Sequence, residues 1–286
     1  MMSATIISGK VVAQNLRNEM KEEIASLKKK NIVPHLTVIL IGDHPASASY
    51  VRGKEKACAE INMSSDIIRL KASITEQELL DKIDALNKNE QVDGILVQLP
   101  LPDHIREQQV IEAIDPAKDV DGFHPVSIGR MMTNQDTFYP CTPFGIIQML
   151  KSEQIDLNGK HAVVIGRSNI VGKPVGQLLL NENATVTYTH SKTVDIKAIT
   201  NEADIVIAAV GKQHFVDASF IKEGAAVIDV GIHRTEDGKL TGDVEFESVK
   251  EKAGYITPVP GGVGPMTITM LLYNTIKACK GLKNIA

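Results

Sequence analysis

Short apolar strands alternate with amphipathic helices along most of this chain, and this alternation restricts the fold more than any other feature of the sequence. Short segments rich in apolar and β-branched residues predict strands at 36–41, 67–70, 94–98, 161–165, 185–188, 204–208 and 225–229, of which 36–41 is a continuous apolar run. Helical periodicity or a capping signal predicts helices at about 9–30, 46–62, 75–87, 104–114, 142–152, 171–181 and 265–280. Strands that alternate with helices form a mostly parallel sheet with right-handed crossovers, so we predict an α/β fold.

The chain has 286 residues, which is enough for two domains of ordinary size. Thr142 followed by Pro143 predicts a helix N-terminus, with Thr142 as the N-cap and Pro143 at the first helical position. Beyond this helix the alternation of strands and helices starts again. We therefore expect an N-terminal α/β domain at residues 1–140 and a Rossmann-like domain with a parallel sheet at residues 141–265.

Composition and charge exclude several functional classes. The net charge is −4 with acidic and basic residues interspersed, which is not typical of a nucleic-acid-binding surface, so we expect no nucleic-acid partner. Apolar runs such as 205–210 are too short to span a membrane, and residues 1–5 do not resemble a secretory signal. Cys58, Cys141 and Cys279 lack metal-site or disulfide spacing, which favours a reducing compartment. We expect a cytoplasmic protein with no membrane partner.

The pair Tyr50 and Lys54 stands at helical spacing directly after a predicted strand. Residues at i and i+4 share one helix face, where a phenol beside an ammonium can stack a flat ligand and hold a proton donor and acceptor close together. Gln98 closes the strand at 94–98, at the sheet edge where α/β proteins bind ligands. The alternatives are a partly exposed pair on an ordinary amphipathic helix and a solvated strand terminus.

The segment from Val163 to Pro174 has the context of a dinucleotide-binding turn. A buried strand ends at Gly166 and a helix follows, which delivers free N–H groups to a pyrophosphate. The match to Gly-x-Gly-x-x-Gly is imperfect because Ser168 and Val171 take the second and third glycine positions. The alternative is a structural strand–turn–helix.

The cofactor type follows from the second strand of this domain. NAD sites commonly carry Asp or Glu at its end to hold the ribose 2′-hydroxyl, but residues 189–191 contain no acid. Arg167 lies in the turn where a 2′-phosphate would bind. The sequence therefore favours NADP over NAD. The alternative for Arg167 is a solvated loop cation.

Five motifs occur together and in a fixed order along the whole chain. They are Tyr50-x3-Lys54, Gln98, Asp121-Gly122-Phe123, Gly166-Arg167-Ser168-x-x-Val171-Gly172-x-Pro174 and the segment from Thr257 to Thr267 that contains Pro-Gly-Gly-Val-Gly-Pro. With these motifs the sequence resembles the bifunctional methylenetetrahydrofolate dehydrogenase/methenyltetrahydrofolate cyclohydrolase family, the FolD type. The resemblance implies two domains that flank a cleft, a last helix at about 266–286 that packs back on the N-terminal domain, and a homodimer formed through the Rossmann-like domains.

The resemblance also implies two reactions on tetrahydrofolate derivatives. In the first, hydride moves from 5,10-methylenetetrahydrofolate to NADP, which gives the methenyl cation. In the second, water adds to that cation and the ring opens to 10-formyltetrahydrofolate. By this resemblance Lys54 is the general acid/base of the hydrolytic step, and Gln98 forms a hydrogen bond with it. Burial beside a cationic ligand disfavours the charged form of a lysine, which suits this task.

Substrate contacts follow from the same resemblance. Tyr50 would stack on the folate, and Asp121 would accept hydrogen bonds from the pterin amino groups, since a carboxylate offers acceptors only. Leu99, Pro260 and Gly261 would line the folate pocket. For the last two, the alternative is a plain connecting loop.

The resemblance assigns the cofactor contacts to the turn after the first Rossmann-like strand, to the ends of two further strands, and to the segment that joins the domains. The matching residues are Gly166, Arg167, Ser168, Ser191, Ile232, Thr142 and Pro143. No metal-ligand spacing is apparent in the sequence, and we expect no metal.

Two other functions remain open from the residues alone. Tyr-x-x-x-Lys also occurs in short-chain dehydrogenases, where it lies downstream of the glycine turn; here Tyr50 lies more than 100 residues upstream of Gly166. A non-catalytic NADP-binding regulatory protein is the second alternative. It is disfavoured because a sensor need not keep the set Tyr50, Lys54, Gln98 and Asp121.

Overall fold

A computed structural model describes residues 3–285, and the chain in it forms two compact units. Unit 1 comprises the chain up to Gln14 together with Pro140–Thr267. Unit 2 comprises Asn15–Tyr139 together with the chain from Ile268 onward. The division falls inside helix α1 (Gly9–Lys28) and helix α10 (Val263–Leu282). Most of the last helix therefore belongs to unit 2.

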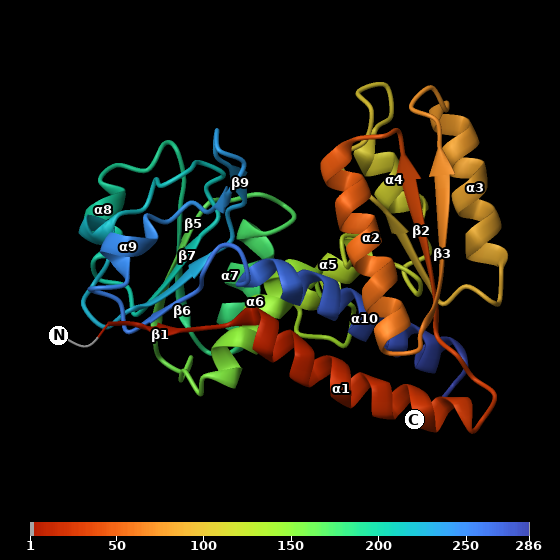
Figure 1. Ribbon diagram of the computed structural model, residues 1–286, viewed down its shortest axis with the longest axis horizontal. Coiled ribbons are helices and arrows are strands. Elements are labelled where there is room, and N and C mark those ends of the chain that lie inside the picture. Colours follow the sequence, from red (N-terminus) through yellow and green to blue (C-terminus); the bar gives the residue numbers. More distant parts are fainter. Residues whose placement is uncertain (1–2, 286) are drawn as a thin grey trace. The chain divides into compact units, whose positions relative to one another are not determined.

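Unit 2 contains a three-stranded parallel sheet in the order β3-β2-β4. Its elements are β2 (His35–Ile41), α2 (Pro45–Glu60), β3 (Ser64–Leu70), α3 (Glu76–Lys88), β4 (Gly94–Val97), α4 (Glu107–Ala113) and α5 (Pro125–Met132). The helices α2, α3 and α4 surround the strands (Figure 1). Ile39 and Ile41 pack with residues of α3 and α4, whereas the alternating Val38 and Leu40 are buried on the opposite face. Both faces of this parallel sheet are thus covered, as its continuous apolar strands require.

The start of α3 shows how local sequence positions an element. The Thr75 hydroxyl accepts the Glu78 N–H at 3.2 Å, and the Glu78 carboxylate accepts the Thr75 N–H at 2.9 Å. Each side chain satisfies a backbone donor that the helix itself leaves unpaired. The predicted capping box is confirmed.

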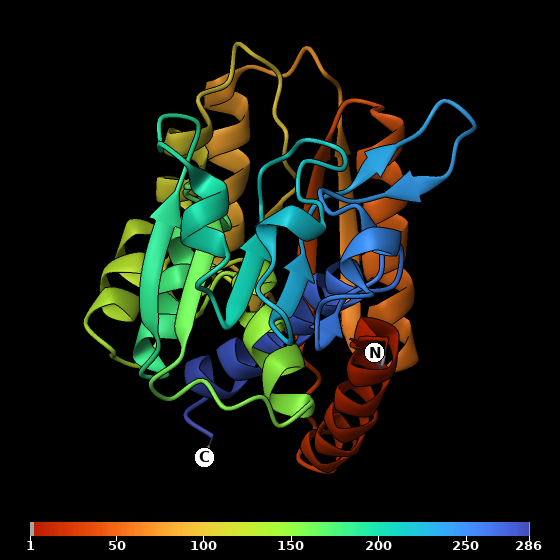
Figure 2. The same cartoon turned by 90° about the vertical axis from the view of Figure 1, so that its left-hand side faces the viewer.

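Unit 1 contains a six-stranded parallel sheet in the order β1-β11-β8-β7-β5-β6, and a separate two-stranded antiparallel hairpin. The strands are β1 (Thr5–Ile6), β5 (His161–Ile165), β6 (Thr185–Thr189), β7 (Ile205–Ala208), β8 (Ala226–Asp229) and β11 (Tyr255–Ile256), and the hairpin is β9 (His233–Arg234) with β10 (Leu240–Thr241). The helices are α6 (Cys141–Ser152), α7 (Gly172–Asn181), α8 (Ile196–Thr200), α9 (Phe246–Val249) and the short 3-10 helix η1 (Ala218–Phe220). Figure 2 faces these strands and shows the hairpin standing away from the sheet.

The strand order of unit 1 creates a ligand-binding edge. β5 lies between β6, which follows it in the chain, and β7, so successive crossovers run in opposite directions from β5. Ligands of open parallel sheets bind at the carboxyl ends of the strands on either side of such a switch point. The segments that follow β5, β6, β7 and β8 therefore meet at one edge.

The predicted N-cap of the helix at 142–152 is wrong. Helix α6 begins at Cys141 with Pro140 as its N-cap residue, so Thr142 is already the second helical residue and not the cap. The Thr142 hydroxyl instead shares a hydrogen bond of 2.8 Å with the Thr267 hydroxyl. Pro143 still lies in the first turn, where a missing N–H costs no intrahelical bond.

Several short elements carried no sequence signal strong enough to predict them, among them β1, β11, α5 and the hairpin β9–β10. Two-residue strands such as β1 show no measurable alternation. Within residues 3–285, no helix has the length and apolar character needed to cross a membrane.

Candidate active site

Helix α2 presents Tyr50 and Lys54 one turn apart, as the spacing predicts. Lys54 is buried, with 6% of its surface exposed, whereas Tyr50 is 36% exposed. The Lys54 Nζ donates a hydrogen bond of 2.9 Å to the Gln98 Oε1. A buried ammonium is tolerated only with hydrogen-bond partners, and the amide oxygen is one of them.

The Gln98 side chain is itself oriented by the backbone. Its Nε2 donates to the Leu99 carbonyl oxygen at 2.7 Å, which turns the Oε1 toward Lys54. Gln98 directly follows β4, and its own N–H donates to the Ile39 carbonyl of β2. The sheet edge therefore holds a neutral hydrogen-bond acceptor against the lysine.

The loop that carries Asp121 is anchored by buried polar side chains. Lys118 donates to the carbonyl oxygens of Leu86, Asn87 and Asn89 at 3.1, 2.8 and 2.8 Å. These carbonyls lie at the C-terminal end of α3, where the helix leaves acceptors unpaired. Burial lowers the pKa of Lys118.

Two further buried residues, Asp119 and Asn274, hold the same loop. The Asp119 carboxylate accepts hydrogen bonds from the His124 N–H at 2.8 Å and the Ser127 hydroxyl at 3.0 Å. Burial raises the pKa of Asp119 although these donors oppose the rise. Asn274 of α10 donates to the Val120 carbonyl at 2.9 Å. Asp121 itself is half-buried and lines a small cavity with Leu99.

In unit 1, Gly166 directly follows β5 and has a φ of +130°, a backbone conformation that favours glycine. A Cβ at this position would lie 2.2 Å from the Ala209 carbonyl oxygen, so the turn needs glycine to pass the segment after β7. The Ser168 hydroxyl accepts the Val171 and Gly172 N–H groups, each at 3.2 Å, and closes the turn at the start of α7. This tight strand–turn–helix fits a dinucleotide pyrophosphate.

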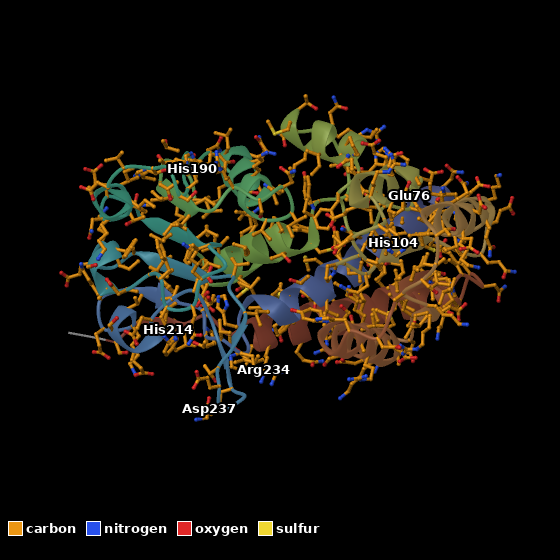
Figure 3. The ribbon with its side chains drawn as sticks, turned by 90° about the horizontal axis from the view of Figure 1, so that it is seen from above. Glu76, His104, His190, His214, Arg234 and Asp237 are labelled. Carbon is orange, nitrogen blue, oxygen red and sulfur yellow. The ribbon has the colours of Figure 1, made fainter. Side chains whose placement is uncertain are left out.

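The other predicted cofactor residues of the strand ends lie at the same edge of the sheet. Arg167 and Ser191 are exposed and follow β5 and β6, and Ile232 is 49% exposed after β8. His190, labelled in Figure 3, begins the loop after β6, where its ring accepts the Lys192 N–H at 3.2 Å. The parallel strands thus bring together Gly166, Arg167, Ser191 and Ile232 from segments far apart in the sequence.

The remaining predicted substrate residues, Pro260 and Gly261, belong to the loop before α10 in unit 1. The Gly261 carbonyl accepts the Lys10 N–H at 3.2 Å, and Pro260 is exposed. This loop is therefore tied to the N-terminus of α1.

The sequence interpretation missed the buried charged residues that support these segments. They are Lys118, Asp119, Asp229 and Asp243, with exposed fractions of 5, 2, 3 and 0%. A signal existed for Asp229, since an acid that ends an apolar strand is as unusual as Gln98 at the end of β4.

An α/β chain with a dinucleotide-binding turn in one unit and a buried lysine on a helix in the other is typical of nicotinamide-dependent oxidoreductases. Comparison with known proteins defines the family. The sequence matches the tetrahydrofolate dehydrogenase/cyclohydrolase catalytic domain over residues 7–121 and the NAD(P)-binding domain of the same family over residues 140–283. The chain belongs to the tetrahydrofolate dehydrogenase/cyclohydrolase family.

Individual relatives are similar over the full length. The bifunctional protein FolD of Oceanobacillus iheyensis is 63% identical over 282 residues, which cover 99% of both chains. The crystal structure of the bifunctional enzyme FolD from Campylobacter jejuni has a TM-score of 0.96 at 50% identity and covers 98% of this chain and 99% of that one. The Trypanosoma brucei dehydrogenase-cyclohydrolase, solved with NADP and an inhibitor, has a TM-score of 0.94 at 40% identity, with 98% and 99% covered.

These findings confirm the predicted family, the enzyme class with its dehydrogenase and cyclohydrolase activities, and the two-domain α/β fold class. They also confirm a nicotinamide cofactor, since the chain carries the family's NAD(P)-binding domain.

Proposed function

We propose that this chain oxidises 5,10-methylenetetrahydrofolate with NADP to the methenyl compound and then hydrolyses it to 10-formyltetrahydrofolate. The observation that carries the proposal is the hydrogen bond from the buried Lys54 Nζ to the Gln98 Oε1, one helical turn from Tyr50. A short-chain dehydrogenase would carry its Tyr and Lys after the glycine turn, and here both precede it. A non-catalytic NADP-binding protein would have no use for a buried acid/base lysine.

For the hydrolytic step, Lys54 is the proposed proton carrier. Water adds to the methenyl carbon and transfers one proton to the neutral Lys54 amine. The bond from that carbon to one ring nitrogen then breaks, and the nitrogen takes a proton from the Lys54 ammonium. The added hydroxyl becomes the formyl C=O and releases its remaining proton to water. The Gln98 amide accepts a hydrogen bond from the lysine in either state, so it orients the Nζ without fixing its charge.

For the oxidation step, unit 1 binds and orients the cofactor. NADP bound there would supply the hydride acceptor for the methylene carbon. Gly166 and Ser168 shape the turn that would hold the pyrophosphate, Ser191 and Ile232 would contact the cofactor from the strand ends, and Thr142 and Pro143 would contact it near the nicotinamide. We assign unit 1 to the cofactor and unit 2 to the folate, and we propose Pro260 and Gly261 as further folate contacts.

Folate binding uses both the stacking and the acceptor groups of unit 2. Tyr50 stacks on the flat ring system; burial raises the pKa of its phenol, so the ring stays neutral. Asp121 accepts hydrogen bonds from the pterin amino groups, and Leu99 contributes an apolar wall. Lys118, Asp119 and Asn274 support Asp121 by fixing its loop.

NADP is the proposed cofactor in preference to NAD. Thr189, His190 and Ser191 provide no carboxylate for a ribose 2′-hydroxyl, whereas the exposed Arg167 provides a guanidinium for a 2′-phosphate. The relative from Trypanosoma brucei was solved with NADP.

We further propose a homodimer and a cytoplasmic location. Cys58, Cys141 and Cys279 are all buried free thiols, and free thiols are typical of a reducing compartment, which supports this location.

The thiols have no proposed part in the chemistry. Burial raises the pKa of Cys58 to about 11, which makes this thiol a poor nucleophile.

The test is an assay of the purified chain with 5,10-methylenetetrahydrofolate and either NADP or NAD, followed by the absorbance of the reduced cofactor and of the methenyl product. Reduction of NADP with transient methenyl absorbance is the expected result. Failure to reduce either cofactor would overturn the dehydrogenase proposal, and stable methenyl absorbance would overturn the hydrolytic one.

A further inference from the structure

Two buried carboxylates, Asp229 and Asp243, lie at the cofactor edge of unit 1 and have no part in the chemistry proposed above. Their side chains receive hydrogen bonds from the backbone and from His233. Asp229 ends β8, Asp243 follows β10, and His233 is the first residue of β9. They join the sheet to the hairpin that stands away from it in Figure 2.

Asp229 binds the backbone on both sides of the hairpin. Its Oδ1 accepts the N–H groups of Gly231 and Asp243, each at 2.9 Å, and its Oδ2 accepts the Val244 N–H at 3.0 Å. Burial raises the pKa of Asp229 to about 6 although these three donors oppose the rise. The carboxylate therefore fixes both ends of the segment 231–243.

Asp243 connects that hairpin to the end of β7. Its Oδ2 accepts the N–H groups of Val210 at 2.6 Å and Gly211 at 2.9 Å. Its Oδ1 accepts a hydrogen bond of 2.7 Å from the His233 Nε2. One buried side chain thus fixes the segment after β7 and the first residue of the hairpin.

The backbone packs closely against these carboxylates, and Gly231 and Gly242 have no space for a side chain. A Cβ at Gly231 would lie 2.3 Å from the Asp243 Oδ1, and one at Gly242 would lie 1.9 Å from the Asp229 Oδ2. The Ala209 carbonyl in turn lies against Gly166, so the held segments reach the dinucleotide turn. The segment with Ile232 is therefore fixed on both sides, by Gly231 and by His233.

We propose that Asp229, Asp243 and His233 are positioning residues that preorganise the cofactor edge, holding Ile232 and residues 209–211 in the arrangement that receives the dinucleotide. The inference rests on the proposed function of unit 1. Binding then costs less conformational entropy, because these loops are already ordered before the cofactor arrives. Polar groups at the edge also keep their orientation, since a fully satisfied buried network is rigid.

The test compares His233→Ala with His233→Gln, which keeps an N–H donor at a similar reach. We expect His233→Ala to raise the Kd for NADP, measured by titration calorimetry, by about 10-fold, and His233→Gln to recover most of the affinity. His214→Ala is the matched control. His214, labelled in Figure 3, also binds the hairpin, through the Thr241 hydroxyl at 2.7 Å, but it contacts neither carboxylate.

Steady-state assays separate positioning from misfolding. The KM for NADP should rise with His233→Ala, whereas hydrolysis of methenyltetrahydrofolate, assigned to Lys54, should stay within about 2-fold of the wild type. An unchanged Kd, or an equal loss with His214→Ala, would overturn the inference. Wild-type protein that binds no NADP would instead overturn the proposed function.

Amide hydrogen exchange of the wild-type protein tests the same inference without any substitution, so it does not depend on a variant that folds. Amide hydrogen exchange of Val210, Gly211, Gly231 and Val244 should already be slow without NADP, since their N–H groups are donated to buried carboxylates. Fast exchange that becomes slow only when NADP is added would contradict preorganisation.

Discussion

Unit 1 holds its functional segments with buried carboxylates, whereas unit 2 also uses buried lysines. Unit 1 uses Asp229 and Asp243, which collect N–H groups from loops at the carboxyl ends of the strands. In unit 2 the buried cations Lys54 and Lys118 donate to oxygen acceptors, and Asp119 assists at one loop. In the described part of the chain, both buried lysines belong to unit 2.

The difference follows from what each unit is proposed to do. A carboxylate with several backbone donors is a fixed anchor, suited to a surface that only binds and orients a cofactor. A lysine carries its charge on a removable proton, so a buried lysine can also do chemistry when its partner is neutral. Lys118 has three carbonyl partners and acts as an anchor, whereas Lys54 faces the amide of Gln98.

The largest expected effect is that of Lys54→Met. This variant should lower the rate of methenyltetrahydrofolate hydrolysis by about 100-fold or more, because a positioned acid/base group contributes that much. The KM for the folate should change far less. Lys56→Met, on the exposed part of the same helix, is the control. A wild-type rate of hydrolysis in Lys54→Met would contradict the acid/base role and leave Lys54 with a structural role like that of Lys118.

The next effect concerns the cation at the cofactor edge. Arg167→Ala should raise the KM for NADP by about 10-fold, since a charge-assisted contact to the 2′-phosphate is lost, and leave the KM for NAD nearly unchanged. Lys173→Ala provides a control at the start of α7, where the lysine donates to the Asn169 side chain at 2.7 Å. An equal rise for both cofactors would contradict the 2′-phosphate assignment.

Lys118→Met tests the anchor role in unit 2. The variant should lower the free energy of unfolding by about 1–3 kcal/mol, because the three α3 carbonyls lose a buried donor. Urea unfolding measures the loss. Lys88→Met removes only the exposed pair with Asp84 on the same helix and should change stability by about 0.5 kcal/mol or less. Similar losses for both lysines would show that the buried contacts add nothing.

The smallest expected effects are two opposite pH dependences, one in each unit. Burial raises the pKa of Asp229 from 3.8 to about 6. Protonation of this carboxyl therefore adds to the free energy of unfolding; the gain is complete below about pH 3.8 and is lost as the pH rises through about 6. Hydrogen bonds from Arg106 lower the pKa of Glu76 from 4.5 to about 2, so its contribution is present above about 4.5 and is lost as the pH falls through about 2.

The variant Glu76→Gln tests the pH dependence of unit 2. It removes the carboxylate that pairs with Arg106 at the surface; Glu76 is labelled in Figure 3. The difference in unfolding free energy between the wild type and this variant should shrink as the pH falls from 5 to about 2. A difference that stays constant over this range would assign the stabilisation to something other than the carboxylate charge.

The sequence determined the α/β class, the central strands and the motif residues by itself. Apolar runs such as 162–165 and 94–97 identify strands because burial on both faces leaves no polar position. The capping box of Thr75 and Glu78 was readable because both partners lie within one helical turn. The hydrogen bond between Lys54 and Gln98 was implied only through the family resemblance.

Only the tertiary structure decided which side chains anchor the functional segments. Asn274 of the last helix binds the Val120 carbonyl, Lys118 binds carbonyls at the end of α3, and Asp243 binds the Val210 N–H. The partners are far apart in the chain, and no local sequence pattern predicts these pairs. Thr142 likewise is not the predicted N-cap, and its hydroxyl shares a hydrogen bond with Thr267, 125 residues away. Local patterns report the period and the ends of an element. A buried charge finds its partners through packing of distant segments, because the cost of burying it is repaid only once those segments meet.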